Sequence, residues 1–110
     1  MDVSVNLQRC FKALSNPVRL DIFLKILEKS CECDVDENEG VGGNCVTQIA
    51  VELELPQPTV SNHVKELVNC GLVESHRRGR KVFLFVSTGV ADEMKSFSEY
   101  VSEKVSAYHM

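Results

Sequence analysis

The chain has 110 residues, 44% of them hydrophobic, which suits a single domain spanning 1–110 whose small core oligomerisation often completes. It has no apolar run of membrane-spanning length and no signal-peptide pattern, so we expect an intracellular, cytoplasmic protein without a membrane partner. The net charge of −4 does not exclude nucleic acid, because residues 57–81 hold five lysines and arginines against two acids and the excess of acids lies in residues 28–39.

Two helices are predicted at the start of the chain. Apolar residues at helical spacing predict an amphipathic helix over residues 3–14. Pro17 fits the first turn of a second helix over residues 17–29, with Ser15 or Asn16 as its cap. Apolar residues occur nearly all round this second helix, so we expect it to be a central, buried helix.

Residues 30–45 do not follow a helical pattern. The segment holds three glycines, five acids and three cysteines, which predicts a Cys-containing acidic loop inserted between helices. A connection of this length in a compact domain is usually functional or disordered. A short helix over residues 46–53 and a turn at residues 54–56 follow it.

The helix predicted over residues 57–70 has two different faces. Val60, Val64 and Leu67 recur at helical spacing and form an apolar face. The opposite face carries side chains whose donors and acceptors can reach base edges and phosphates. Gly71 stands where a helix commonly ends. The polar residues of that face are Gln57, Ser61, Asn62 and Lys65.

A hairpin is predicted over residues 72–86, with short strands on either side of a basic tip. A final helix follows, capped by Ser87 or Thr88, and a stripe of apolar residues lines one side of it. The first helix offers a matching stripe, so both would build a two-fold interface. The predicted fold class is mostly α with a small β-hairpin (α+β): a winged helix-turn-helix of the order α-α-α-α-β-β-α, forming a homodimer through its first and last helices.

Two stretches of the chain resemble the ArsR family of small winged-helix repressors. FKALSNPVRLDIFLKIL resembles the family's second helix, and LPQPTVSNHVKELVNCGLVESHRRGRKVFLFV resembles its recognition helix (QPxVSxHxKxLxxxGLV) and its Gly-Arg-Lys wing. The resemblance covers nearly the whole chain and implies a homodimeric repressor that binds an inverted-repeat operator in its own promoter. Inducers of the family are usually metal or metalloid ions, and sometimes reactive sulfur species. Pro56 departs from the pattern, which more commonly has serine there, and we expect the helix to begin within one residue of Gln57.

The resemblance also implies DNA contacts, residue by residue. The lysines and arginines would mostly meet phosphates, and Gln57, Ser61 and Asn62 would read base edges in the major groove. An arginine at the hairpin tip could enter the minor groove. Taken singly, each of these side chains fits a solvated surface equally well. The predicted DNA-binding residues are Gln57, Thr59, Ser61, Asn62, His63, Lys65, Arg77, Arg78, Arg80 and Lys81.

Cys31, Cys33 and Cys45 are the predicted metal site. No cofactor is required, but thiolates select soft ions, so a bound ion of As, Sb, Cd, Pb or Zn would fit. A structural metal, an idle loop, and a redox switch in which Cys45 pairs with Cys31 or Cys33 are the alternatives. The family's Cys-x-Cys site is not intact, because Thr47 stands where its second cysteine is expected. The family's other metal site is not reproduced, since Asp92 has no histidine two residues on.

The sequence also bears on the functions that compete with a metal-modulated regulator. An enzyme is not expected, because no nucleophile and base stand at a recognisable spacing and no glycine loop suits a phosphate. The alternatives to a metal-modulated regulator are a redox-responsive or ligand-independent regulator with a structural cysteine loop, and a winged helix used for protein interaction. The basic wing favours a polyanion as the partner. Cys10 and Cys70 are expected to pack as small hydrophobes.

Overall fold

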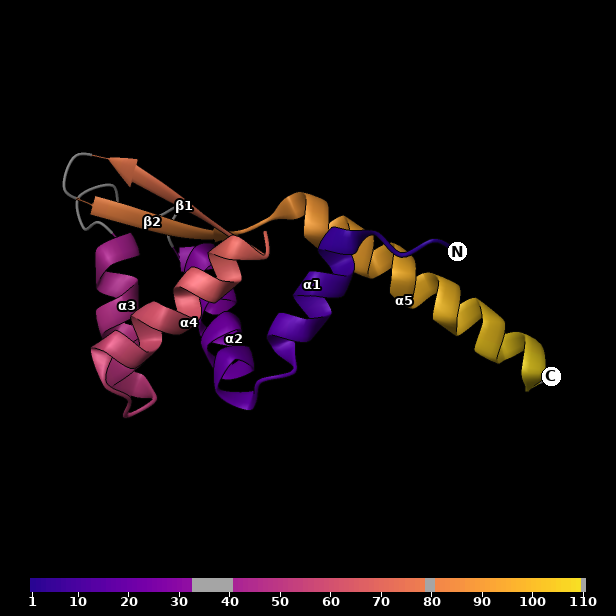
Figure 1. Cartoon of the computed structure of the whole chain (residues 1–110), viewed down its shortest axis with the longest axis horizontal. Coiled ribbons are helices and arrows are strands. Elements are labelled where there is room, and N and C mark those ends of the chain that lie inside the picture. Colours follow the sequence, from indigo (N-terminus) through magenta and orange to yellow (C-terminus); the bar gives the residue numbers. More distant parts are fainter. Residues whose placement is uncertain (33–40, 79–80, 110) are drawn as a thin grey trace.

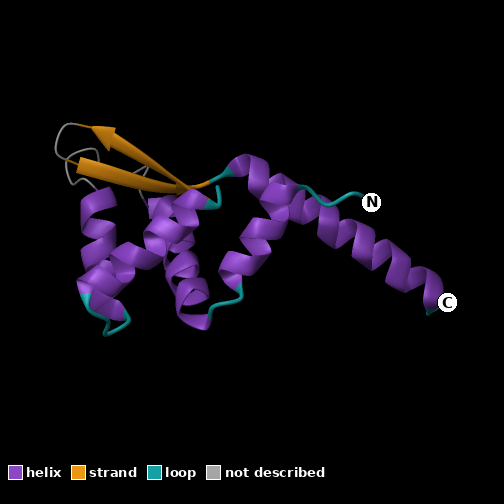
Figure 2. Cartoon of the chain, viewed as in Figure 1, coloured by secondary structure: helices purple, strands orange, loops and turns teal. Residues whose placement is uncertain are grey.

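The computed structural model describes residues 1–32, 41–78 and 81–109. Helices form most of the fold, and the two strands that it describes pair as an antiparallel hairpin, so the predicted fold class and element order are confirmed (Figures 1 and 2). The elements are α1 (Val5–Leu14), α2 (Pro17–Glu32), α3 (Val41–Glu52), α4 (Gln57–Asn69), β1 (Val73–Arg78), β2 (Lys81–Val86) and α5 (Thr88–Tyr108).

Side-chain caps begin the first two helices and the last. The Ser4 hydroxyl accepts a hydrogen bond from the Leu7 amide at 3.0 Å, and Asn16 Oδ1 accepts from the amides of Val18 and Arg19 at 3.0 and 3.1 Å. Ser87 Oγ caps α5 in the same way. Each cap gives an otherwise unpaired amide of the first turn a partner, which fixes where the helix starts. The predicted caps Asn16 and Ser87 are confirmed.

The core lies between α2, α3, α4 and the base of the hairpin. One side chain from each of these helices, Ile26, Ile49 and Leu67, has no exposed surface, and Leu84 of β2 closes the cluster at 2% exposure. β2 packs against both α2 and α3, while α4 packs against α2 and α3 from the other side. Burial of a large aliphatic side chain contributes about 1.5–3 kcal/mol, so this cluster is the main source of stability.

The prediction of a central, buried α2 is correct for only part of its surface. Ile22 and Ile26 are buried, but Leu20, Leu24 and Leu27 are 37%, 45% and 42% exposed. Among the described elements, α2 packs against α1, α3, α4 and β2. The three leucines, spaced four and three residues apart, therefore form a second apolar stripe on the outer side of this helix.

The predicted loop over residues 30–45 is shorter at both ends. α2 continues to Glu32 and α3 begins at Val41, so only residues 33–40 remain between them, and these lie outside the described residues. No glycine or proline stands at residues 30–32 to stop α2. The glycines near the start of α3 each cost a helix about 1 kcal/mol relative to alanine, which weakens a first turn without forbidding it.

The strands of the hairpin are longer than predicted. The register pairs Val73 with Val86, His76 with Phe83 and Arg78 with Lys81. The backbone of the basic cluster therefore runs along the strands, apart from Gly79 and Arg80, which lie outside the described residues. Pairing gives the backbone amides and carbonyls of both segments hydrogen-bond partners, which is why Arg77, Arg78 and Lys81 join the ladder.

A single buried residue joins α4, β1 and α5. The Leu72 amide donates to the Leu67 carbonyl of α4 at 3.1 Å, and the Leu72 carbonyl accepts from the Ser87 amide, just before α5, at 2.8 Å. Its side chain has no exposed surface. Gly71, with φ +88°, makes the turn that brings Leu72 into this position, in a region of φ that favours glycine.

α5 projects from the rest of the molecule. Figure 1 shows it running away from α2, α3 and α4 with α1 beside its first half, and it makes the molecule long, with extents of 53 × 26 × 24 Å. The Phe11 and Phe97 rings join α1 to α5, with centroids 5.1 Å apart. Val101 and Val105, further along the predicted stripe, are 41% and 48% exposed. None of the helices in the described ranges has the length and apolarity that a membrane crossing requires.

Candidate nucleic-acid interface

α4 presents a polar face to solvent because its other face is fixed in the core. Val60 and Leu67 have no exposed surface, and Val64 is 8% exposed. Gln57, Asn62 and Lys65 are exposed on the opposite side. Successive residues of a helix turn by 100°, so burying one side leaves these side chains free to contact a partner. Thr59, Ser61 and His63 lie between the two faces and are half-buried.

The helix begins at Gln57, as expected. Pro56 takes the cap position with φ −60° and ψ 140°, and no side chain of the described residues caps the helix. Pro56 and Pro58 have no amide hydrogen, and the amides of Thr59 and Val60 both donate to the Pro56 carbonyl, at 3.1 and 3.2 Å. A serine cap would serve the second or third amide of the helix, but the second residue is Pro58 and the third, Thr59, already donates to the Pro56 carbonyl, which is why proline is tolerated here.

A tight turn sets α4 against α3. Glu54 has φ +55°, and the Leu55 amide donates to the Ala50 carbonyl at 2.9 Å. A left-handed residue other than glycine costs roughly 1–2 kcal/mol, and the packing of both helices against the core offsets that cost. The turn makes α3 and α4 one helix-turn-helix unit with its polar face outward.

The hairpin carries the other predicted contacts. Arg77 and Arg78 lie in β1 and Lys81 begins β2, and the structure describes these three residues by their backbone positions. Arg80 lies outside the described residues. Since β1 follows α4 after three residues and Leu72 is fixed at its base, the backbone brings the basic segment close to the helix-turn-helix unit.

Three further cations, absent from the predicted set, line a hollow beside the last turn of α4. Arg9 and Lys12 of α1 and Arg19 of α2 surround this hollow of about 310 Å³, together with Glu66 and Asn69 of α4. Arg9 and Lys12 are three residues apart on α1, and helix packing brings Arg19 of α2 to them. Excess positive charge next to a polar helix face is suited to a phosphate group.

Arg19 is the most constrained of these cations. One of its terminal nitrogens donates to the Ala13 carbonyl at 3.2 Å, which holds the end of α1 against the start of α2. Its Nε is buried and has no hydrogen-bond partner among the described residues. A buried donor without a partner is costly, so an anion that reached this nitrogen would relieve that cost.

The predicted metal site cannot be built from the side chains that the structure places. Cys33 lies outside the described residues, and Cys31 and Cys45 are described by their backbone positions in α2 and α3. Among the described residues, no group of three or more histidine, cysteine, aspartate or glutamate side chains could hold a metal ion. The three-cysteine site stays a prediction.

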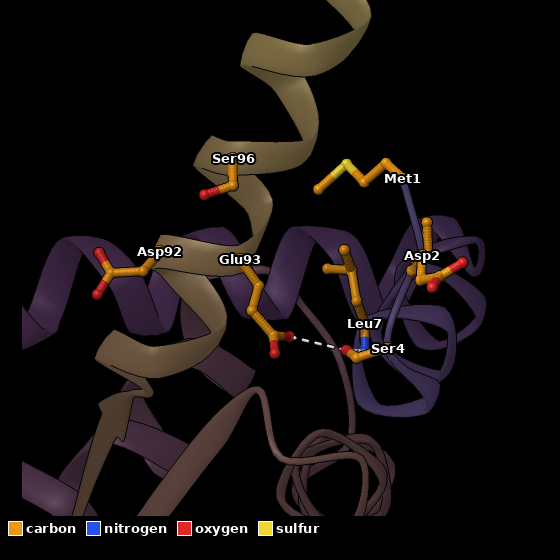
Figure 3. Close-up of a pocket in the computed structure, with 8 residues that line it drawn as sticks. Met1, Asp2, Ser4, Leu7, Asp92, Glu93 and Ser96 are labelled. Carbon is orange, nitrogen blue, oxygen red and sulfur yellow. Dashed lines mark hydrogen bonds between the residues drawn. The ribbon is translucent and has the colours of Figure 1, made fainter.

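A second hollow lies between the N-terminal segment and the first turns of α5. Figure 3 shows the Glu93 carboxylate directed at Ser4, whose hydroxyl donates to it at 3.0 Å, while Asp92 points away from Ser4. Met1, Asp2 and the first turns of α5 complete the lining. This contact joins the start of α1 to α5, and the acidic lining is unsuited to a polyanion.

A helix-turn-helix unit with an outward polar face, followed by a basic antiparallel hairpin, defines a winged helix-turn-helix protein. The model of the protein family described as "Bacterial regulatory protein, arsR family" matches residues 39–75 of this chain. An uncharacterized HTH-type transcriptional regulator from Methanocaldococcus jannaschii is 34% identical over 93 residues, which cover 84% of this chain and 88% of that protein. The chain belongs to the ArsR family of transcriptional regulators. The expected family, and the expectation of a regulator in place of an enzyme, are confirmed.

Two solved structures are similar over most of the chain. The cadmium metal-sensor CMTR from Mycobacterium tuberculosis has a TM-score of 0.53 and 29% identity, covering 81% of this chain and 80% of that one. A homodimeric winged helix-turn-helix DNA-binding domain from Mycobacterium bovis has a TM-score of 0.58 and 24% identity, covering 90% of this chain and 80% of that one. The second similarity shows the fold.

Proposed function

We propose that this regulator binds an inverted-repeat operator as a homodimer and represses transcription. The observation that carries the proposal is the open face of α4, where Gln57, Asn62 and Lys65 are exposed opposite a fully buried apolar face. Gln57, Ser61 and Asn62 read base edges, because amide and hydroxyl groups of this length pair with the donors and acceptors of the major groove. Thr59, His63 and Lys65 position the helix on the backbone.

The basic residues supply the phosphate contacts. Positive charge gives affinity for any DNA sequence and makes binding sensitive to salt, whereas base contacts give specificity. The cations around the hollow at the end of α4 add positive charge beside that helix. The cations that we assign to phosphate are Arg77, Arg78, Arg80, Lys81, Arg9 and Lys12.

The dimer is proposed because α1 and α5 leave large apolar side chains exposed to solvent. Phe11, Val101 and Val105 are all at least 39% exposed, and two of them lie on the stripe along the projecting helix. A two-fold arrangement that pairs this stripe with itself would bury it, and it would present two copies of α4 to the two halves of an inverted repeat. The homodimeric relative supports this arrangement.

A thiophilic metal or metalloid ion bound by Cys31, Cys33 and Cys45 is proposed to change operator affinity. Its support is the clustering of three soft ligands within 15 residues and the cadmium-sensing relative. The helices that carry Cys31 and Cys45, α2 and α3, both pack against α4. Drawing the two helix ends together would therefore move the reading helix.

DNA binding is tested by fluorescence anisotropy with the reduced protein and DNA from its own upstream region. Asn62→Ala should weaken operator binding by about 1–3 kcal/mol and leave binding to unrelated DNA unchanged. Lys65→Ala should weaken both and lower the slope of log K against log salt by about one unit. Lys95→Ala, which removes the same charge from an exposed site on α5 away from its stripe, is the matched control. Equal effects of the two lysine changes would exclude α4 as the DNA-binding helix.

Ion sensing needs a separate titration of the preformed complex with arsenite, cadmium and zinc. One of these ions should release the DNA at near-stoichiometric amounts, and Cys33→Ser should abolish the release while DNA affinity without the ion is unchanged. A complex that forms and ignores all three ions would retain the regulator and remove the sensing proposal. Loss of DNA binding by the Cys33→Ser protein itself would indicate a structural metal.

A further inference from the structure

Two cysteines outside the predicted metal site meet at the seam between α1 and α4. Cys10 lies in α1, and Cys70 ends α4, 60 residues later. The Cys10 thiol donates to the Cys70 carbonyl at 3.5 Å. The Cys70 thiol donates to the Leu67 carbonyl at 3.3 Å. Both cysteines are free thiols.

The two thiols differ in access. Cys10 has no exposed surface. Cys70 is half-buried and lines two open hollows, one of about 310 Å³ and one of about 330 Å³, on either side of the end of α4. A small oxidant dissolved in water therefore reaches Cys70 first and meets Cys10 only through it.

Their chemistry is linked as well. Burial raises the pKa of the Cys10 thiol to about 12, with smaller contributions from the charge of Cys70, its hydrogen bond and the charge of Glu93. Two of the smaller causes come from Cys70 itself, in agreement with the contact between the two residues.

We propose that Cys10 and Cys70 are a modification site that a hydroperoxide oxidises to an intramolecular disulfide, joining α1 to the end of the recognition helix. The Cys70 sulfur attacks one oxygen of hydrogen peroxide and the O–O bond breaks. The other oxygen departs with the thiol proton as one water, and Cys70 becomes a sulfenic acid. The Cys10 sulfur then attacks the Cys70 sulfur, the S–O bond breaks, and the hydroxyl departs with the Cys10 proton as a second water. The two thiols lose two electrons in all, and one peroxide gains them.

The disulfide would act on α4 through its end. A disulfide holds its two sulfurs about 2.05 Å apart and its Cβ atoms about 3.5–4.5 Å apart, so it replaces an adjustable contact with a fixed one. Cys70 is followed by Gly71 and Leu72, which join α4 to β1 and α5. Fixing Cys70 to α1 would therefore tilt α4 and the hairpin base together and weaken operator binding. This consequence, unlike the modification itself, rests on the proposed function.

The modification is tested on a full-length variant with Cys31→Ser, Cys33→Ser and Cys45→Ser, which leaves only this pair. Hydrogen peroxide should remove two hydrogen atoms from the intact mass, and peptide mapping under non-reducing conditions should recover Cys10 linked to Cys70. Adding Cys10→Ala should stop the reaction at a Cys70 sulfenic acid, trapped by dimedone. Adding Cys70→Ala should prevent reaction at Cys10. Mapping of the unaltered chain gives the same linked peptide if the variant has kept the native fold.

DNA affinity is measured on the same samples. Oxidation should weaken operator binding by at least about fivefold, the lower end of typical coupling between two sites, and dithiothreitol should restore it. A peroxide-treated protein with both thiols intact, or with Cys70 joined only to a second chain, would overturn the modification site. A disulfide that leaves affinity unchanged would overturn its effect on α4. Absence of DNA binding by the reduced, unaltered chain would instead remove the proposed function, whereas its absence only in the three-serine variant would indicate a structural metal; in both cases the mapped disulfide would still stand.

Discussion

The two ends of the molecule bury their apolar residues to very different extents. In the body formed by α2, α3, α4 and the hairpin, Ile26, Ile49 and Leu67 are completely enclosed by other parts of the same chain. In α5, whose residues are all described, Val90 is the one that is buried. Both regions carry apolar residues at helical spacing. The spacing identifies an apolar helix face that favours burial, and the structure shows whether residues of the same chain bury that face.

The difference also separates two functions. The enclosed body holds the reading helix rigidly, because each turn of its apolar face contacts the core. The α1 and α5 end leaves its outer surface available for a second copy. Operator recognition should therefore depend on both ends, through base contacts at one and through the spacing of two reading helices at the other.

The largest expected effect breaks the proposed dimer. Val101→Glu with Val105→Glu places two charges on the α5 stripe, so the protein should sediment as a monomer and bind operator DNA roughly 10²–10⁴-fold more weakly, because two linked half-sites become one. Ser102→Glu with Ser106→Glu adds the same charges on another side of α5 and should do neither. If the valine variant kept its dimer and its affinity, the exposed stripe would have another use.

A second test measures how the free energy of unfolding depends on protein concentration when an apolar residue of either region is truncated. Leu67→Ala should lower the free energy of unfolding by about 2–5 kcal/mol, measured by urea denaturation, because it leaves a cavity in the enclosed core. That loss should be the same at every protein concentration. Val105→Ala should have an effect that varies with concentration, since a residue buried by a second copy contributes through association. A concentration-independent effect of Val105→Ala would argue that α5 packs within its own chain.

A third test uses pH at the seam between the regions. The pKa of Cys10 is raised from 9.0 to about 12 by burial, with help from Cys70 and Glu93. The unfolded chain therefore loses this proton first, so the stabilisation is complete below pH 9.0 and is lost as pH rises through about 12. The free energy of unfolding should fall by up to about 1.4 kcal/mol per pH unit over this window, measured by urea denaturation. Cys10→Ala should remove this part of the slope, and an unchanged slope would place the titration on other groups.

The smallest expected effect loosens the projecting end alone. Ser4→Ala removes both the cap of α1 and the hydrogen bond to Glu93 of α5, which should cost about 1 kcal/mol. Amide exchange should speed up in α1 and the first half of α5 and stay unchanged in α4. Ser75→Ala, an exposed serine of β1, is the control. Faster exchange throughout the chain would mean that the two regions unfold as one unit.

The sequence predicted the elements of the body well where local signals were strong. The cap at Asn16, the start of α4 at Gln57 and the positive φ at Gly71 all follow from residue chemistry within one turn. The outer stripe of α2 did not follow, because a run of apolar residues cannot indicate how many neighbours a helix will have. Strand ends at the hairpin were also underestimated, since ladder pairing outweighs the low strand preference of arginine and lysine.

The candidate site was predictable only along single elements. The open face of α4 can be read from periodicity, since all of its residues lie on one helix. The cations at Arg9, Lys12 and Arg19 come from two other helices, and the contact of Cys10 with Cys70 spans 60 residues. Such groupings are set by tertiary packing, which no local pattern encodes.

The two hydrogen bonds of Leu72 have a mechanical consequence. Its amide is held by the last turns of α4 and its carbonyl by the residue before α5, so one peptide segment acts as a common anchor for both helices. The two hydrogen bonds link the end of α4 to the start of α5 through Leu72. A twist applied along α5, by whatever packs on it, would be transmitted to the reading helix through a rigid joint. Mutations that change operator affinity without touching DNA should therefore concentrate around this joint.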